Sequence, residues 1–89
     1  MEHANAQRHI SNRLRKYREI AGLTQKEVAA KMGLIGWGRI SLWESGQSTP
    51  GFDNLFLLSI IYKTPIDELY FGHRETLINE LKDRTENMG

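Results

Sequence analysis

Apolar residues in this chain recur at helical spacing, and no stretch alternates with the period of two that marks a β-strand. The first repeat has intervals of four, three and four residues, which place its members on one helical face: Ile10, Leu14, Tyr17 and Ala21. Gly22 directly follows this face, and glycine is the residue that most often ends a helix. The sequence therefore predicts a first helix that ends just before Gly22.

The clearest helix start in the chain is a capping box at Thr24-Gln25-Lys26-Glu27. The Thr24 hydroxyl is placed to accept a hydrogen bond from the backbone N–H of Glu27. The Glu27 carboxylate can in turn accept from the N–H of Thr24. We predict a short helix over about residues 25–32, ended by Gly33.

Two further helices are predicted on either side of a polar loop that contains Pro50. Residues 39–44 have apolar side chains on one side, and Gly46 then ends the helix. Residues 52–62 are predicted to form the next helix. Lys63 follows it, at a position where a glycine cap would be favoured.

The last third of the chain predicts two more helices. Thr64 suits the N-cap and Pro65 the first helical position of a brief helix that ends near Gly72. Residues 74–85 form an amphipathic segment, and we expect the residues after Thr85 to fray. The apolar stripe of this segment consists of Leu77, Ile78 and Leu81. The prediction as a whole is a bundle of five or six short helices.

Length and composition fit one small globular domain. The chain has 89 residues, of which 39% are hydrophobic and 26% charged, and it has no cysteine, which excludes disulfides and cysteine-ligated zinc. Its longest apolar run is four residues, 55–58, far below the about 20 needed to cross a membrane. The first residues lack the pattern of a secretory signal. We therefore expect a cytoplasmic protein without a membrane partner.

Charge is divided unevenly along the chain. Residues 1–50 hold eight basic and four acidic residues, a net charge of +4. Residues 51–89 hold four basic and seven acidic residues, a net charge of −3. A basic half suits a polyanionic partner such as DNA, and the acidic half would face away from it.

Two runs of residues stand in an order found in a known family. The first run is Leu14-Arg15-x-x-Arg18-x-x-x-Gly22-Leu23-Thr24-Gln25-x-x-Val28-Ala29-x-x-Met32-Gly33. The second run is Ile40-Ser41-x-Trp43-Glu44-x-Gly46, Pro50, Leu55-x-x-Leu58 and Ile66-Asp67-Glu68-Leu69. Over about residues 10–72 the chain thus resembles the phage repressor and Cro-like, or Xre-type, helix-turn-helix family.

The resemblance implies an all-α fold, a lambda-repressor-like bundle with a helix-turn-helix core. Residues 1–72 would form the DNA-binding domain, and residues 73–89 a C-terminal amphipathic helix and frayed tail. The implied function is a sequence-specific DNA-binding transcription regulator, a repressor, whose third helix reads the major groove of double-stranded DNA.

The resemblance also assigns roles to individual residues. The implied base-reading positions are Trp37, Gly38, Arg39 and Leu42. The implied contacts to the DNA backbone are Thr24, Gln25, Lys26, Ser41, Ser45, Gln47 and Ser48. Arg18 and Glu44 resemble an internal ion pair that links the first helix to the third.

Several of these side chains have the chemistry that the implied roles require. A guanidinium at Arg39 can pair with guanine O6 and N7, which is worth about 1–3 kcal/mol of discrimination. Gln25 opens a helix, where free N–H groups and the positive dipole end favour a phosphate. Arg13, Arg15 and Lys16 fit either a solvated face or phosphate contacts.

The sequence departs from the family before its third helix. Six residues separate Gly33 from Ile40, one more than the common spacing, and two of them are glycines. Each glycine costs a helix about 1 kcal/mol relative to alanine, so the start of this helix is open to fraying or displacement. Trp37 would then either face the groove or fold back over Ile35.

Two alternatives remain beside the regulator. One is a DNA-binding antitoxin, which would need a toxin partner. The other is a helical interaction module that has lost DNA binding, a reading supported by the glycines before the third helix. A neighbouring toxin reading frame would identify the first alternative, and a gel shift against randomised DNA the second.

The residues offer no support for an enzyme. His3, His9 and His73 lack metal-ligand spacing. Asp67 and Glu68 suit the first turn of a helix, where acids complement the dipole, better than a catalytic pair. We expect no metal, no cofactor and no small-molecule ligand.

The helix over residues 52–62 is apolar nearly all round, which predicts burial on more than one side. Three of its residues suffice for the inward face. The second face would pack either on the last helix of the same chain or on another subunit. We predict a homodimer on a pseudo-palindromic operator, with interface residues Phe56, Leu57, Ile60, Ile61, Leu77, Ile78 and Leu81.

Overall fold

The structure is a computed structural model that describes residues 9–88, and it consists of helices joined by short turns. In chain order these are α2 (Leu14–Ile20), α3 (Gln25–Met32), α4 (Gly38–Ser45), α5 (Phe52–Tyr62), α6 (Ile66–Leu69) and α7 (Phe71–Met88). No strand occurs among residues 9–88, and the predicted all-α class is confirmed. His3 lies outside the described residues.

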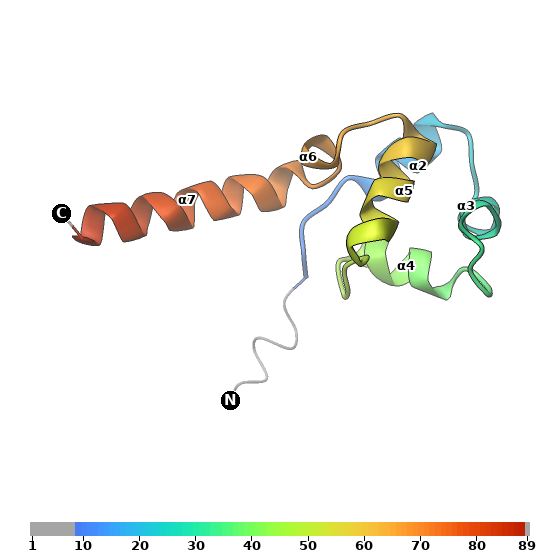
Figure 1. The fold of residues 1–89 in the computed structure, drawn as a ribbon, viewed down its shortest axis with the longest axis horizontal. Coiled ribbons are helices and arrows are strands. Elements are labelled where there is room, and N and C mark those ends of the chain that lie inside the picture. Colours follow the sequence, from blue (N-terminus) through green and yellow to red (C-terminus); the bar gives the residue numbers. More distant parts are fainter. Residues whose placement is uncertain (1–8, 89) are drawn as a thin grey trace.

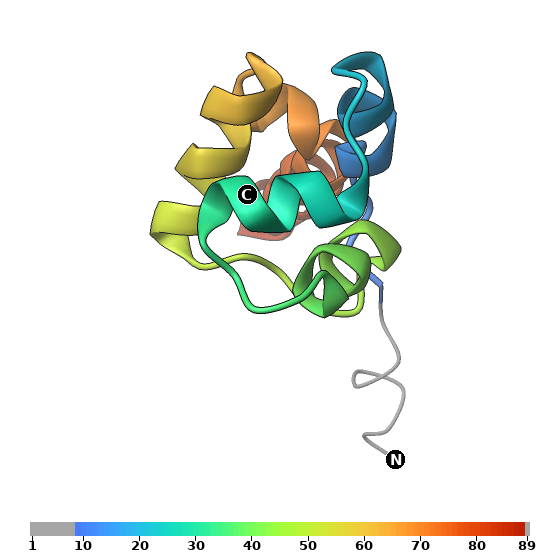
Figure 2. The same cartoon turned by 90° about the vertical axis from the view of Figure 1, so that its right-hand side faces the viewer.

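Helices α2 to α6 surround one core, whereas α7 leaves it. Figure 1 shows α7 extending from α6 away from the other helices. Figure 2, viewed from the side of α3, shows α3 lying across the bundle with α4 below it. The helix-turn-helix pair α3 and α4 therefore sits at the end of the molecule opposite the tip of α7.

The core takes side chains from each of the five helices α2 to α6. Five side chains are almost completely buried, and burying one of this size contributes roughly 1.5–3 kcal/mol. The buried apolar residues are Leu14, Val28, Ala29, Ile40, Trp43, Leu58, Leu69, Tyr62 and Tyr70. Because α4 contributes Ile40 and Trp43 to this core, its opposite side is left for solvent or a partner.

The first helix is shorter than predicted. α2 begins at Leu14, and Ile10 lies in a non-helical segment before it. The Ile10 N–H donates to the Gly46 carbonyl at 2.8 Å, so this segment is held by the end of α4. Ala21, the last residue of the predicted helical face, is exposed at the C-terminal end of α2.

Asn12 explains why α2 starts where it does. Its side-chain oxygen accepts from the Leu14 N–H at 3.0 Å, which satisfies one of the free donors at the helix start. Its amide nitrogen donates to the carbonyls of Ile10 and Trp43, both at 3.0 Å. One side chain thus joins the start of α2 to the last turn of α4.

The capping box of α3 is confirmed. The Glu27 N–H donates to Thr24 Oγ1 at 3.0 Å, and the Thr24 N–H donates to Glu27 Oε1 at 2.8 Å. Gly33 ends the helix with a φ of 74°, in the left-handed region that glycine adopts without strain.

The glycine-rich turn between α3 and α4 does not prevent a helix from starting at Gly38. Gly36 takes a φ of 73°, which lets the chain reverse, and α4 begins at Gly38. Arg39 therefore stands in the first helical turn. Ile35 is completely exposed, so the alternative in which Trp37 folds back over it is wrong.

The predicted cap at Thr64 is wrong. α6 begins at Ile66 with Pro65 as its N-cap residue, and the Thr64 hydroxyl donates to the Tyr62 carbonyl at 2.9 Å. Lys63, at the end of α5, adopts the left-handed conformation with a φ of 53°. Here a lysine occupies a position that glycine would fill at lower conformational cost.

The break between the last two helices falls earlier than predicted. It lies at Tyr70 rather than near Gly72, and α7 runs from Phe71 to Met88 with Gly72 inside its first turn. The helix also continues through residues 86–88, where we expected fraying.

Candidate nucleic-acid interface

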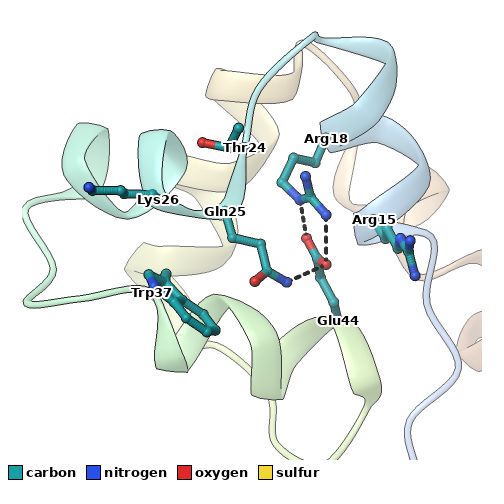
Figure 3. A pocket seen from close by; sticks show the side chains of 7 residues that line it. All are labelled: Arg15, Arg18, Thr24, Gln25, Lys26, Trp37 and Glu44. Atoms are coloured by element: carbon teal, nitrogen blue, oxygen red, sulfur yellow. Dashed lines mark hydrogen bonds and ion pairs between the residues drawn. The ribbon is translucent and has the colours of Figure 1, made fainter.

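A shallow hollow of about 510 Å³ lies where α2, the start of α3 and α4 meet. Figure 3 shows the side chains around it, with Gln25 and Glu44 joined near its centre. The lining residues are Arg15, Arg18, Thr24, Gln25, Lys26, Trp37 and Glu44. The cationic residues outnumber the single carboxylate, so the hollow favours an anion.

The predicted ion pair between Arg18 and Glu44 is present. Arg18 Nε lies 2.5 Å from Glu44 Oε2, and Arg18 Nη2 donates to Glu44 Oε1 at 3.2 Å. Their side chains are 12% and 6% exposed, so solvent screens the pair weakly. The hydrogen bond to Glu44 raises the pKa of the Arg18 guanidinium. Arg18 also donates to the Leu23 carbonyl at 2.9 Å, which ties the turn before α3 to the same pair.

Gln25 is held by the same carboxylate. Its Nε2 donates to Glu44 Oε1 at 2.9 Å, which fixes the side chain at the N-terminal end of α3. An amide nitrogen carries two hydrogens, and this bond uses one of them. The second hydrogen and the first backbone N–H groups of α3 are the donors available to a phosphate.

All four base-reading positions implied by the resemblance are exposed, at the N-cap or on the outer side of α4. Trp37 is the N-cap residue of α4, is 51% exposed and lines the hollow together with Gln25. Gly38, Arg39 and Leu42 follow it on the helix. Their opposite side is the buried face formed by Ile40 and Trp43.

The residues assigned to the DNA backbone differ in how well their side chains are placed for a phosphate contact. Lys26 is exposed at the hollow, and Ser41 lines a smaller hollow beside Gln25. The Ser45 hydroxyl donates to the Leu42 carbonyl at 3.0 Å, which leaves it as an acceptor and weakens the case for a phosphate contact. The Thr24 hydroxyl oxygen accepts the capping-box hydrogen bond from the Glu27 N–H.

The remaining two backbone candidates follow α4 directly. Gln47 and Ser48 are both exposed. The Gln47 N–H donates to the Leu42 carbonyl at 3.1 Å and closes the end of the helix. Their side chains therefore project from a fixed turn.

Two of the three basic residues of α2 and its start, Arg13 and Arg15, separate in the structure. Arg15 lines the hollow and pairs with Glu19 at 3.1 Å on the surface. Arg13 pairs with Glu68 at 2.6 Å on the side of α6, so it belongs to the fold rather than to the hollow. The sequence could not separate them, because the helical spacing does not show which neighbour each side chain meets.

The residues assigned to a dimer interface fall on two separate surfaces. Phe56, Leu57 and Ile60 are exposed on α5, and Leu77 and Leu81 are 50% and 60% exposed on α7. Ile61 and Ile78 are partly buried. Because α7 projects away from the bundle (Figure 1), the alternative in which it covers α5 in the same chain is wrong.

Two features are absent from residues 9–88, the part of the chain that the structure describes. Among these residues, no helix is both long and apolar enough to cross a membrane. The same residues contain no group of three His, Cys, Asp or Glu side chains arranged to hold a metal ion.

A family model described as helix-turn-helix matches residues 14–69, which is more than half of the chain and covers α2 to α6. The chain is a member of the Xre-type helix-turn-helix family. Family members are DNA-binding regulatory domains, and the matched residues include the whole of α4.

A curated relative supports the same class. The chain is 29% identical over 76 residues to the HTH-type transcriptional activator BcrR of Enterococcus faecalis. The match covers 85% of this chain and 37% of that protein, so the chain spans well under half of its relative's length. No solved structure matches the chain significantly.

Proposed function

We propose that this DNA-binding transcription regulator reads the major groove of a pseudo-palindromic operator with the outer side of α4. The observation that carries this proposal is the exposure of Arg39 and Leu42 on a helix whose other side is fixed in the core. A recognition helix that is held rigidly can present the same side chains to base edges each time it binds.

Affinity is proposed to come from the rim of the hollow. Gln25, Lys26 and Arg15 offer donors to phosphate oxygens, and the pair of Arg18 with Glu44 holds Gln25 in place. Contacts of this kind position the protein on the duplex without reading its sequence. They also make binding fall as the salt concentration rises, because each neutralised phosphate releases counterions.

Specificity is proposed to come from Arg39 and, to a lesser degree, from Trp37 and Leu42. A guanidinium pairs with guanine O6 and N7, whereas an indole or a leucine side chain contacts thymine methyl groups or sugars. Gly38 contributes no side chain, and its role would be to let the backbone approach the groove.

The proposed assembly is a homodimer. The exposed stripe of Leu77 and Leu81 on a projecting helix needs a partner, and a second copy offers the same stripe. Two recognition helices placed one helical turn of DNA apart, about 34 Å, would bind two half-sites together. The exposed face of α5 is the competing interface.

Repression is the proposed outcome, since a bound dimer that overlaps a promoter excludes polymerase without any further contact. The relative BcrR is described as an activator. Activation would require a second surface that contacts the transcription machinery. An operator placed across or upstream of a promoter in a reporter strain separates the two. Transcription that rises with the protein in both placements would overturn repression. A regulator of this kind would work in the cytoplasm, beside the chromosome.

The direct test is selection of bound duplexes from randomised DNA, followed by footprinting. We expect one enriched motif with two inverted half-sites. Selection of no motif would support the interaction module without DNA binding. A single protected half-site would contradict the dimer but leave DNA reading intact.

A further inference from the structure

Gly72 lies in the first turn of α7, where a glycine does not stabilise the helix. Glycine is a poor helix former, so its place in the first turn of α7 suggests a neighbour that a side chain would meet. A Cβ atom built on Gly72 would lie 2.2 Å from Ser11 Oγ and 3.0 Å from Ser11 Cβ. Rotation of the serine hydroxyl relieves the first contact but not the second. Gly72 therefore lets α7 pass close to the segment before α2.

A polar cluster holds the other side of the same junction. Arg13 Nη1 donates to Glu68 Oε2 at 2.6 Å, and the Tyr17 hydroxyl donates to the same oxygen at 2.5 Å. The Arg13 guanidinium also lies 4.6 Å from the centre of the Phe71 ring, within the range of a cation–π contact. The Arg13 N–H donates to the Leu69 carbonyl at 2.7 Å, so backbone and side chain both bind the end of α6.

These contacts lie at the start of a long helix, so a small change of angle there moves the far end of the helix by a large distance. α7 has 18 residues and is therefore about 27 Å long. A tilt of about 10° at Gly72 would move its tip by about 5 Å, more than the 3.4 Å rise of one base pair. If two copies meet through α7, its direction decides how far apart their recognition helices lie.

We propose that Ser11 and Gly72, together with the contacts of Arg13 to Glu68 and Phe71, are positioning residues that set the direction of α7 and thereby the half-site spacing that the dimer accepts. The proposal rests on the proposed assembly through α7. It adds that operator spacing is specified by a junction that contacts neither the DNA nor the second subunit.

The first experiment measures the direction of α7 without DNA. The chain has no cysteine, so Lys31→Cys and Lys82→Cys introduce two unique sites for spin labels on α3 and α7. Labelled protein is diluted with excess unlabelled protein, so that distances within one chain dominate. We expect one narrow distance in the otherwise wild-type protein, a shifted distance in Gly72→Val, and recovery in the double variant Ser11→Gly/Gly72→Val.

Thr76→Val is the matched control, because it places the same side chain one turn further along α7 at an exposed position. It should leave the distance unchanged. Arg13→Gln serves as the second variant, since it loosens the junction without adding bulk. It should broaden the distance distribution even where Gly72→Val does not fold. If both Arg13→Gln and Gly72→Val gave the same mean label distance and the same width of distribution as the wild type, the proposal would be overturned.

The second experiment measures spacing. Duplexes carry two copies of the selected half-site separated by inserts of different length. Gly72→Val should prefer an insert changed by at least one base pair, with the affinity for a single half-site within twofold of wild type, and Ser11→Gly should restore the original insert. An unchanged preference despite a shifted label distance would overturn the link to spacing. A wild-type protein that remains monomeric on a single half-site would instead overturn the assembly, while the label distance still tests the junction.

Discussion

Arg18 on α2 faces Glu44 on α4 across a distance of 2.5 Å between Nε and Oε2, and both side chains are almost buried. The same carboxylate accepts from Gln25 at the start of α3. One acidic group therefore joins three helices behind the proposed DNA-reading surface. The orientation of α4 relative to the end of α3 depends on this carboxylate.

Glu44→Ala should destabilise the fold by about 3 kcal/mol or more, because it leaves the Arg18 charge buried without its partner. Chemical denaturation with a linear extrapolation measures the change. Glu19→Ala is the control, since it breaks the exposed pair with Arg15 and should cost at most about 1 kcal/mol. Equal free energies of unfolding in Glu44→Ala and wild type would show that the pair does not stabilise the protein.

Arg39→Ala should relax base preference at one position of each half-site, whereas Gln25→Ala should weaken binding to all sequences about equally. The first loses a contact to a base edge and the second a contact to phosphate. Selection from randomised DNA and a salt titration of binding check both variants. A motif that stays the same in Arg39→Ala would mean that this side chain does not read the groove.

Charged substitutions on α5 and on α7 distinguish which of these two exposed apolar surfaces forms the dimer interface. If the dimer forms through α7, Leu77→Glu and Leu81→Glu should give monomers in analytical ultracentrifugation, because a buried charge without a partner is costly. Leu57→Glu and Ile60→Glu should act in the same way if α5 contributes to the interface. Ile35→Glu, at an exposed site in the turn before α4, controls for added charge. A wild-type protein that sediments as a monomer at micromolar concentration contradicts both interfaces.

We expect the hydrogen bonds of Glu68 to make the stability of the fold sensitive to acid. Hydrogen bonds from Tyr17 and then Arg13 lower the pKa of its carboxyl group in the folded state. A lowered pKa gives stability that is complete above the ordinary glutamate pKa and is lost as the pH falls through the folded value. The advantage of wild type over Glu68→Gln should therefore be largest near neutral pH and shrink in acid. Thermal melts from pH 7 to pH 2 test this, with Glu80→Gln as the control for loss of a surface carboxylate. A gap that grows in acid would reverse the assignment.

Lys63→Gly should stabilise the protein by roughly 0.5–1 kcal/mol. The left-handed backbone at Lys63 strains any residue with a Cβ atom, and glycine removes this strain. Part of the gain in stability is lost again, because glycine has more conformational freedom in the unfolded chain. Lys63→Ala keeps the Cβ atom and removes the charge, so it should show no such gain. A melting temperature of Lys63→Gly equal to that of Lys63→Ala would show that the strain is negligible.

The parts of the fold that were predicted correctly depend on neighbouring residues. The capping box joins Thr24 to Glu27 within one turn, and Gly33 and Gly46 end their helices by their own conformational freedom. The ion pair of Arg18 and Glu44 spans 26 residues and was reached through the family resemblance. Spacing alone would not have identified it.

The errors arise where distant segments decide the outcome. Glu68 lies in the first turn of α6, as predicted, but its side chain also accepts from Arg13 and Tyr17, which stand 55 and 51 residues away and which the spacing does not reveal. Gly72 was interpreted as a helix end, whereas its position is explained by the approach of Ser11. Asn12 is not among the predicted residues, although asparagine side chains often accept from the backbone N–H two residues further on, as Asn12 does from Leu14.

The backbone hydrogen bonds of the segment before α2 have a consequence for synthesis on the ribosome. Ile10 donates to Gly46 and Arg13 donates to Leu69, so the earliest part of the domain is held by residues that emerge much later. A nascent chain that has reached only α3 lacks both acceptors, and its first helix has no fixed start. We expect the domain to become resistant to proteases in a single late step, once Leu69 has left the ribosome, rather than helix by helix as the chain grows.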